Sequence, residues 1–294
     1  MKVLVFGGSG MLGTDVQAVL ERGFHVFCPS HSEIDILDQH RVDQCVADFD
    51  PDVIINCAAY TDVERAEDHP EDVWRLNSDA VSNLARAACK CDTRLVHMST
   101  DYVFDGVNRE YLAEDAPCRP LSIYGKTKRA GELACLTLLP ERTLVVRTSW
   151  LFGGRGPNFV STMLRLSAQK ERLEVVADQF GSPTYTLDLA NCLKHLLGYP
   201  EVSGIIHVSN QGTCSWHHFA EAIITGWAAL GNDVVTKDVV PIPSSEWPSK
   251  APRPSWSSFS MSKLEEEADY RMSSWEIALS DYLSFRSSDD EYQR

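Results

Sequence analysis

Residues 2–13 read KVLVFGGSGMLG, and this stretch decides the fold. The apolar run at 2–6 predicts a buried strand, and the helical spacing of apolar residues over 11–21 predicts a helix soon after it. Between them the glycines fit both G-x-G-x-x-G and G-x-x-G-x-x-G, with Gly7, Gly10 and Gly13 in the second spacing. Glycines let a backbone approach a pyrophosphate, and a helix N-terminus adds N–H groups and a positive dipole. The turn therefore predicts a dinucleotide site; a tight turn without a ligand is the alternative.

Alternating strands and helices extend from this turn to residue 148. Further strands are expected at 24–28, 52–59, 95–99 and 144–148, and helices at 37–49, 77–89 and 125–136. Such alternation predicts an α/β fold, namely a Rossmann-like, doubly wound parallel sheet with helices on both faces.

The rhythm loosens after about residue 150. The segment 241–258 (PIPSSEWPSKAPRPSWSS) is too irregular for the main sheet and too aromatic for a plain linker, so we assign it to a smaller lobe over the substrate. Closing helices are expected at 262–267 and 273–283, and a frayed polar tail at 287–294. We expect an NAD(P)-binding Rossmann domain at 1–150, to which about 180–212 returns, and a mainly substrate-binding C-terminal α/β lobe at 151–294.

Composition narrows the class of partner and the compartment. The chain carries 27 Lys and Arg against 42 Asp and Glu, a net charge of −15, which repels nucleic acid and anionic membranes. Nine cysteines, an odd count without a C-x-x-C pair, argue against a disulfide framework and for a reducing compartment. We see neither a signal-peptide pattern nor a long apolar run, so the cytoplasm is expected. The acidic run at 62–68 is interpreted as a solvated helix start.

The end of the second strand bears on the choice of cofactor. Residues 28–32 read CPSHS, whereas sites that prefer NAD usually carry an acidic residue here that holds the ribose 2′-hydroxyl. Glu33 and Asp35 come later. Ser30 and His31 can hydrogen-bond a 2′-phosphate, although no Arg reinforces them. We therefore expect NADPH, with NADH as an alternative.

A polar cluster follows the strand at 95–99. Thr100 and Asp101 lie there, and ligands of open parallel sheets bind at the carboxyl ends of strands. Tyr124 and Lys128 are four apart at a helix start, so their side chains share one face. Reduction of a ketone needs a hydride and a proton. We expect Lys128 and the positive nicotinamide ring together to lower the pKa of Tyr124. Tyr124 then donates the proton, and Thr100 hydrogen-bonds the substrate oxygen. Strand alternation turns Ser99 to the opposite side.

Several stretches carry a family resemblance. They are FGGSGMLG (6–13), PDVIINCAAYTDVERAE (51–67), STDYVFDG (99–106), PLSIYGKTKRAGE (120–132), RTSWLFG (147–153), DQFGSPTYTLDLA (178–190), GIIHVSNQGTCSW (204–216) and KAPRPSWSSFSMSKLE (250–265). In these motifs the chain resembles the dTDP-4-dehydrorhamnose reductases, which are extended short-chain dehydrogenase/reductases, over nearly its whole length. STDYVFDG, RTSWLFG and DQFGSPT are together the most specific.

The resemblance implies an activity and a set of site residues. The activity is NADPH-dependent reduction of the C4 keto group of dTDP-4-dehydro-β-L-rhamnose to dTDP-L-rhamnose, in nucleotide-sugar biosynthesis. The catalytic residues would be Thr100, Tyr124 and Lys128. The expected cofactor contacts are Gly7, Gly10, Met11, Leu12, Gly13, Ser30, His31, Asp35, Ile36, Ala58, Ala59, Tyr60, Met98, Tyr124 and Lys128. The expected substrate contacts are Thr100, Asp101, Phe104, Trp150, Asn158, Gln179 and Arg253.

Other activities on the same scaffold stay open. A related 4-ketoreductase could act on another nucleotide-linked 4-keto-6-deoxy sugar. A 4,6-dehydratase or epimerase of nucleotide sugars is a second alternative, but such dehydratases place Asp-Glu after the Thr, and Tyr102 follows Asp101 here. A third is a regulatory subunit of the methionine adenosyltransferase type, against which the intact Thr100, Tyr124 and Lys128 argue.

Metal binding and assembly are weakly indicated. Some members of the family dimerise through Mg²⁺ bound by acidic residues, and Asp15 falls at one such position, as Asp rather than Glu. We predict no metal site, with Mg²⁺ as the alternative, and either a monomer or a homodimer.

Overall fold

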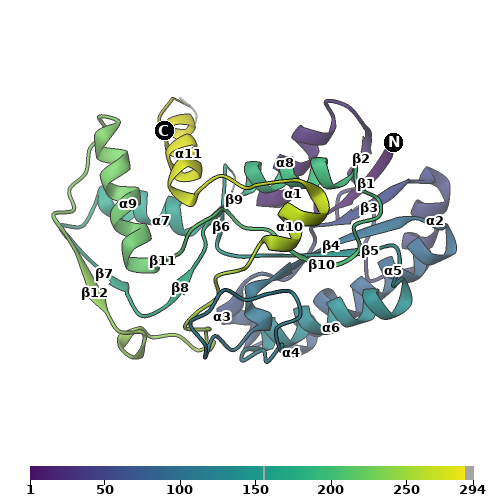
Figure 1. The fold of residues 1–294 in the computed structure, drawn as a ribbon, viewed down its shortest axis with the longest axis horizontal. Helices are drawn as coiled ribbons and strands as arrows, with labels where there is room; N and C mark the ends of the chain where they lie inside the picture. Colours follow the sequence, from purple (N-terminus) through teal and green to yellow (C-terminus); the bar gives the residue numbers. More distant parts are fainter. Residues whose placement is uncertain (155, 289–294) are drawn as a thin grey trace.

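Six parallel strands form the central sheet of the computed structural model, which describes residues 1–154 and 156–288 (Figure 1). Their order is β10-β5-β4-β3-β1-β2. The strands are β1 (Lys2–Phe6), β2 (His25–Phe27), β3 (Val53–Asn56), β4 (Arg94–Thr100), β5 (Thr143–Thr148) and β10 (Gly204–His207). The chain winds in opposite directions from β1, because β2 and β3 flank it on either side. Open α/β sheets bind ligands at such a point.

Helices cover both faces of the sheet, which confirms the doubly wound fold. Alternation along β1 sends Val3 and Val5 to one face and Leu4 and Phe6 to the other. The first face is covered by α1 (Met11–Leu20), α8 (Thr186–Leu196) and α10 (Ser262–Ala268). The second is covered by α2 (Gln39–Phe49), α5 (Ala80–Lys90) and α6 (Ile123–Leu138). Strands buried on both faces explain the continuous apolar runs in the sequence.

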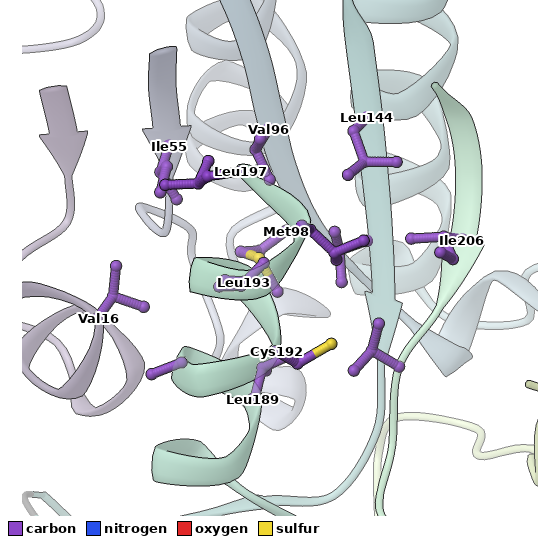
Figure 2. Close-up of a cluster of buried hydrophobic side chains, with 14 of the residues drawn as sticks. Val16, Ile55, Val96, Met98, Leu144, Leu189, Cys192, Leu193, Leu197 and Ile206 are labelled. Atoms are coloured by element: carbon purple, nitrogen blue, oxygen red, sulfur yellow. The ribbon is translucent and has the colours of Figure 1, made fainter. Parts of the chain in front are cut away.

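The core beneath the first face joins distant parts of the chain. Figure 2 shows Met98 and Leu144, from β4 and β5, facing Leu189 and Leu193 of α8. Ile206 of β10 lies beside them. The segment from 186 to 207 thus supplies both a helix and the sixth strand of the central sheet.

The helix predicted at 77–89 begins earlier than expected. It follows α3 (Val63–Ala66) and starts as α4 (Pro70–Trp74), continues through a π-helical segment at Arg75–Asp79 and runs into α5. Pro70 at the first helical turn, with acidic residues beside it, favours initiation there. The polar residues of this segment hide the start from an apolar-periodicity argument.

A second group of elements packs beside the sheet, on the left in Figure 1. It contains α7 (Phe159–Ser167), α9 (Trp216–Ala229) and α11 (Trp275–Ser288) around a core that includes Phe152, Phe219 and Trp275. Short strand pairs complete it: β6 (Leu151–Phe152) with β9 (Thr184–Tyr185), β8 (Phe180–Gly181) with β11 (Cys214–Ser215), and β7 (Arg172–Val176) with β12 (Asp238–Ile242). The predicted tail at 287–294 falls almost wholly outside the described residues. No helix among the described residues has the length and apolar character to span a membrane.

Candidate active site at the carboxyl ends of the strands

The glycine turn joins β1 to α1 at the point where the chain reverses its winding. Gly7 has φ +80°, and a Cβ there would lie 2.5 Å from the backbone nitrogen of Ala58. A Cβ on Gly13 would overlap the Gly7 carbonyl, so both positions require glycine. Within the described part of the chain, no side chain caps α1 at Gly10. The first N–H groups of this helix are therefore suited to a diphosphate.

The neighbours of this turn differ in how they face it. Leu12 is 7% exposed and belongs to the core beneath the sheet, so its backbone is the part suited to phosphate. Met11 is half-buried and its sulfur lies 3.7 Å from Asn158 Nδ2. Ile36 is a core residue, whereas the Asp35 carboxylate accepts from the backbone N–H of Leu37.

The loop after β2 contains a carboxylate that turns back on Ser30. Glu33 Oε2 accepts from the Ser30 hydroxyl at 2.7 Å and from its backbone N–H at 2.8 Å. Ser30 and Ser32 hydroxyls are 3.0 Å apart, and His31 is exposed beside them. These hydrogen bonds from Ser30 lower the pKa of Glu33, so a negative charge lies where a 2′-phosphate was expected. From the sequence alone, Glu33 comes after the position where an acidic residue usually holds the ribose 2′-hydroxyl.

The loop after β3 is held by a buried asparagine that the sequence analysis missed. Asn77 accepts from the Tyr60 backbone N–H at 2.8 Å and donates to the Tyr60 carbonyl at 3.1 Å. It also donates to Thr127 Oγ1, at 3.2 Å, on α6. Ala58, Ala59 and Tyr60 are half-buried in this loop. Asn77 thus links the predicted ribose region to the helix that carries Tyr124.

Thr100 ends β4 and caps the short 3-10 helix Asp101–Val103. Its hydroxyl donates to Asp101 Oδ1 at 3.0 Å and accepts from the Tyr102 backbone N–H at 3.2 Å. Burial raises the pKa of Asp101 to about 6, against the hydrogen bond from Thr100. Thr100 and Asp101 lie at the carboxyl end of the strand, as predicted.

Tyr124 and Lys128 lie on the first turns of α6, whose N-cap is Ser122. Thr100 is near enough to the Tyr124 phenol to act on its pKa, and the Tyr124 ring packs edge-on against Tyr102 with centroids 5.4 Å apart. Lys128 Nζ donates to the Met98 carbonyl at 2.6 Å. The structure therefore brings Thr100, Tyr124 and Lys128 to one place.

Burial dominates the electrostatics of Tyr124 and Lys128. It raises the pKa of the Tyr124 phenol and lowers that of Lys128 to about 8. The predicted lowering of the Tyr124 pKa includes the positive nicotinamide ring as well as Lys128, so it stays a prediction.

Beneath this cluster lies an ionic network that the sequence analysis also missed. Ser99 points away from Thr100, as predicted, and donates to Glu132 Oε1 at 2.5 Å. Glu132 in turn pairs with Arg147 at 2.8 Å, and both side chains are fully buried. Two signals could have found it: Glu132 follows Lys128 by one helical turn, and Arg147 interrupts an apolar strand.

The predicted substrate contacts are less uniform. Phe104 is a correction: it is 1% exposed and packs against Phe259, His207 and the Arg147 guanidinium, so it belongs to the core. Asn158 caps α7, where its side chain accepts from the Ser161 backbone N–H and donates to the Gly153 carbonyl. Both the oxygen and the nitrogen of the Asn158 amide are therefore hydrogen-bonded to the backbone within the chain.

Trp150 and Gln179 lie on the side of the second group of elements. Trp150 has φ +49° and stacks on Trp216 with ring centroids 3.4 Å apart. Gln179 is half-buried immediately before β8, and Gly181 of that strand lies against the Trp150 indole.

Arg253 reaches the site from the C-terminal segment. Its guanidinium pairs with Glu64 at 2.6 Å and is near enough to the Tyr102 phenol to act on its pKa. Lys250 pairs with Asp68, also at 2.6 Å. The interpretation of the acidic run as merely solvated is thus wrong, because Glu64 and Asp68 bind the segment 249–253.

Metal-binding and thiol chemistry add little to this site. Across residues 1–154 and 156–288, no group of three His, Cys, Asp or Glu side chains is arranged to hold a metal ion. Asp15 accepts a hydrogen bond from the Thr186 hydroxyl. All nine cysteines are free.

A dinucleotide-type turn and a Thr–Tyr–Lys cluster at the carboxyl ends of a doubly wound sheet define an NAD(P)-dependent oxidoreductase of the short-chain class. The chain belongs to the RmlD substrate binding domain family, whose sequence model matches residues 1–287. This agrees with the resemblance found in the motifs.

Named relatives cover nearly the whole chain. It is 38% identical over 288 residues to the spore coat polysaccharide biosynthesis protein SpsK of Bacillus subtilis, covering 98% of each chain. It is 36% identical over 292 residues to dTDP-4-dehydrorhamnose reductase of Salmonella typhimurium, covering 97% of each. The crystal structure of dTDP-4-dehydrorhamnose reductase from Bacillus anthracis in complex with NADP superposes with a TM-score of 0.91 at 36% identity, covering 97% of this chain and 99% of that one.

Proposed function

We propose that this protein is a dTDP-4-dehydrorhamnose reductase, which uses NADPH to reduce the C4 keto group of dTDP-4-dehydro-β-L-rhamnose to dTDP-L-rhamnose, with NADH as an alternative reductant. The observation that carries the proposal is the meeting of Thr100, Tyr124 and Lys128 at the edge of the sheet where β1 also ends in the glycine turn. The relatives named for this reaction, at 36% identity along almost the whole chain, support the choice of substrate.

The residues around the glycine turn fit a dinucleotide. We assign the diphosphate to the start of α1 at Gly10, Met11 and Leu12. The Gly10 N–H donates to the Gly7 carbonyl at 3.1 Å, so the N–H groups of Met11 and Leu12 are the ones suited to the anion. Ser30, His31 and Asp35 would lie toward the adenosine, and Ala58, Ala59 and Tyr60 toward the other half of the cofactor. Met98, predicted as a further contact, has its side chain in the core against α8 and its carbonyl bound to Lys128. When bound, NADPH supplies the hydride that adds to the C4 carbon.

Tyr124 supplies the proton that converts the C4 oxygen to a hydroxyl. Because burial raises its pKa, the phenol keeps its proton at neutral pH until the substrate oxygen becomes basic. The Lys128 ammonium, one turn along α6, then offsets the negative charge left on the phenolate. Thr100 donates a hydrogen bond to the same oxygen, which requires its hydroxyl to turn from Asp101.

The remaining groups bind the nucleotide sugar. Asp101 is placed to accept from a sugar hydroxyl, Trp150 offers an aromatic face, and Gln179 offers an amide. Arg253 carries the guanidinium suited to the diphosphate. In this assignment residues 1–150, with the returning segment at about 180–212, bind the cofactor, and the rest of 151–294 mainly binds substrate. Nine free thiols favour the cytoplasm as the compartment.

A substrate panel tests the proposal. Purified protein is mixed with NADPH or NADH and a set of nucleotide-linked 4-keto-6-deoxy sugars, and cofactor absorbance and product NMR are recorded. Stoichiometric loss of NADPH with formation of dTDP-L-rhamnose is expected. Product without net NADPH loss would indicate a dehydratase or epimerase, and absence of turnover with every sugar would favour a regulatory subunit.

A different preferred sugar is the second candidate. It is favoured by the relative named for spore coat polysaccharide biosynthesis, which is 38% identical. The same panel separates the two, because the ratio of kcat/KM values between sugars measures the preference directly.

A further inference from the structure

Glu132 lies at the centre of a buried set of charges directly below the Thr–Tyr–Lys cluster. Its Oε1 accepts from Ser99 Oγ at 2.5 Å and from Arg147 Nε at 2.8 Å. Its Oε2 accepts from Arg129 Nη1 at 2.6 Å and from Arg147 Nη2 at 2.9 Å. The carboxylate and the Arg147 side chain are fully buried, so these bonds are shielded from water.

The network holds the strand end that delivers Thr100. Ser99 immediately precedes Thr100 on β4, and Arg147 lies on the adjacent strand β5 in register with Ser99. Glu132 joins both strands to α6, the helix that carries Tyr124. Its loss would therefore leave the Lys128–Met98 hydrogen bond to hold the strand against the helix without the ionic network.

The network also affects the pKa of Lys128. Burial lowers the pKa of Lys128 to about 8, and Glu132, one helical turn away, acts against that. The other groups that face Lys128 are Cys135 on α6, Cys57 after β3 and His97 on β4. Burial lowers the pKa of His97 far below its ordinary value, so it is neutral. The cysteines are neutral too, because burial raises the pKa of each to about 12.

Glu132 is charged in this setting. Burial alone would raise its pKa, but hydrogen bonds from Arg147, Ser99 and Arg129 hold it below its ordinary value. Without that charge, Lys128 would lose the one carboxylate that acts to raise its pKa among the groups named here, and the guanidinium groups of Arg147 and Arg129 would lose their shared partner.

We propose that Glu132 is a positioning residue that keeps Lys128 positively charged and holds the Thr100 end of β4 against α6. The inference rests on the proposed reductase function for its kinetic consequences, and on the geometry of the network for its electrostatic ones.

The change Glu132→Gln keeps the shape and removes the charge. Lys128 then loses its proton at lower pH, because the Glu132 carboxylate that acts against the effect of burial on its pKa is gone. We expect the alkaline limb of the kcat profile to move down by about one pH unit, with a lower kcat at neutral pH. Glu132→Asp retains the charge, so its alkaline limb stays where the wild-type limb lies even if its shorter reach lowers kcat.

Arg129→Gln is the opposite test and perturbs the fold less, because the Arg129 side chain is partly exposed. Removing a positive charge from this neighbourhood raises the alkaline limb. Glu141→Gln changes an exposed glutamate after α6 and leaves the limb unchanged. An unshifted limb in folded Glu132→Gln, or a downward shift in Arg129→Gln, would overturn the proposal.

A substrate-free measurement separates this inference from the proposed function. Between the folded and unfolded pKa of Lys128 only the unfolded chain binds the proton, so the free energy of unfolding rises with pH from about 8. In Glu132→Gln this rise starts at lower pH, and adding Lys128→Met abolishes it. Chemical denaturation across the neutral and alkaline range records both. No turnover by wild-type protein defeats the reductase assignment; an unchanged onset of the rise defeats the role of Glu132.

Discussion

The Lys128 ammonium nitrogen lies 2.6 Å from the carbonyl oxygen of Met98, thirty residues earlier in the chain. This hydrogen bond ties α6 to β4 two residues before Thr100. Because Tyr124 precedes Lys128 by one turn of the same helix, the bond also positions the phenol against the Thr100 hydroxyl. An ammonium has three donors, of which this bond uses one.

The phenol is the first group to test. Tyr124→Phe removes the proton donor but retains the ring that packs on Tyr102. We expect kcat to fall by about 100-fold or more, while the affinity for NADPH stays within about twofold. Steady-state kinetics and fluorescence titration with NADPH measure the two quantities. Tyr199→Phe, three residues after the end of α8, is the matched control; retained turnover in the Tyr124 variant would defeat the mechanism.

Asp101 provides a test of stability against pH. Burial raises its pKa from the ordinary 3.8 to about 6, so the folded chain binds this proton more tightly than the unfolded chain. The free energy of unfolding therefore falls as pH rises from 3.8 to about 6. The loss amounts to about 3 kcal/mol.

The change Asp101→Asn removes that loss. At neutral pH the variant should be more stable than wild type by up to about 3 kcal/mol, with the difference vanishing at acidic pH. Its activity should fall, because the carboxylate is assigned to the sugar. Denaturant unfolding at several pH values checks the first point; equal stabilities at all pH values would contradict the buried, titrating carboxyl.

The sheet was predictable because local patterns specify it. Apolar runs such as 2–6 and 144–148 mark strands buried on both faces, and glycine spacing marks the turn between β1 and α1. The cluster of Thr100, Tyr124 and Lys128 followed from the rule that parallel strands end at one edge. These features depend on few residues, close together in sequence.

The pairing of distant charges was not predictable in this way. Glu64 contacts Ser249, 185 residues later, and Arg253 beyond it. An acidic run looks the same whether it is solvated or paired, since its partners lie in another part of the fold. The effect of burial on the Tyr124 pKa was not predictable for a related reason, because burial depends on the packed environment and not on a neighbour one turn away.

The loop after β2 predicts how cofactor choice can be changed. Glu33 is charged and binds Ser30, where a 2′-phosphate would meet a like charge. Glu33→Gln should raise kcat/KM for NADPH relative to NADH by about fivefold, because the repulsion is removed. Glu266→Gln makes the same charge change at an exposed position of α10 and should leave the ratio of kcat/KM values for NADPH and NADH unaltered. A ratio that is the same in both variants would place the 2′-phosphate away from Glu33.

The ion pair between Arg253 and Glu64 allows substrate binding to be tested apart from cofactor binding. If the guanidinium meets the diphosphate of the sugar nucleotide, Arg253→Ala should raise KM for that substrate by about tenfold or more and leave KM for NADPH nearly unchanged. Lys250→Ala removes the neighbouring, more exposed pair with Asp68 and should change neither value by more than about twofold. Equal changes in KM for the sugar nucleotide in the two variants would mean that the segment 249–253 acts by stabilising the fold, because loss of either ion pair would then weaken it. A rise in KM for the sugar nucleotide in Arg253→Ala alone would mean that the guanidinium contacts the substrate. Both variants weaken the contact between the segment 249–253 and the acidic residues around α3, but only Arg253→Ala removes a donor to the diphosphate.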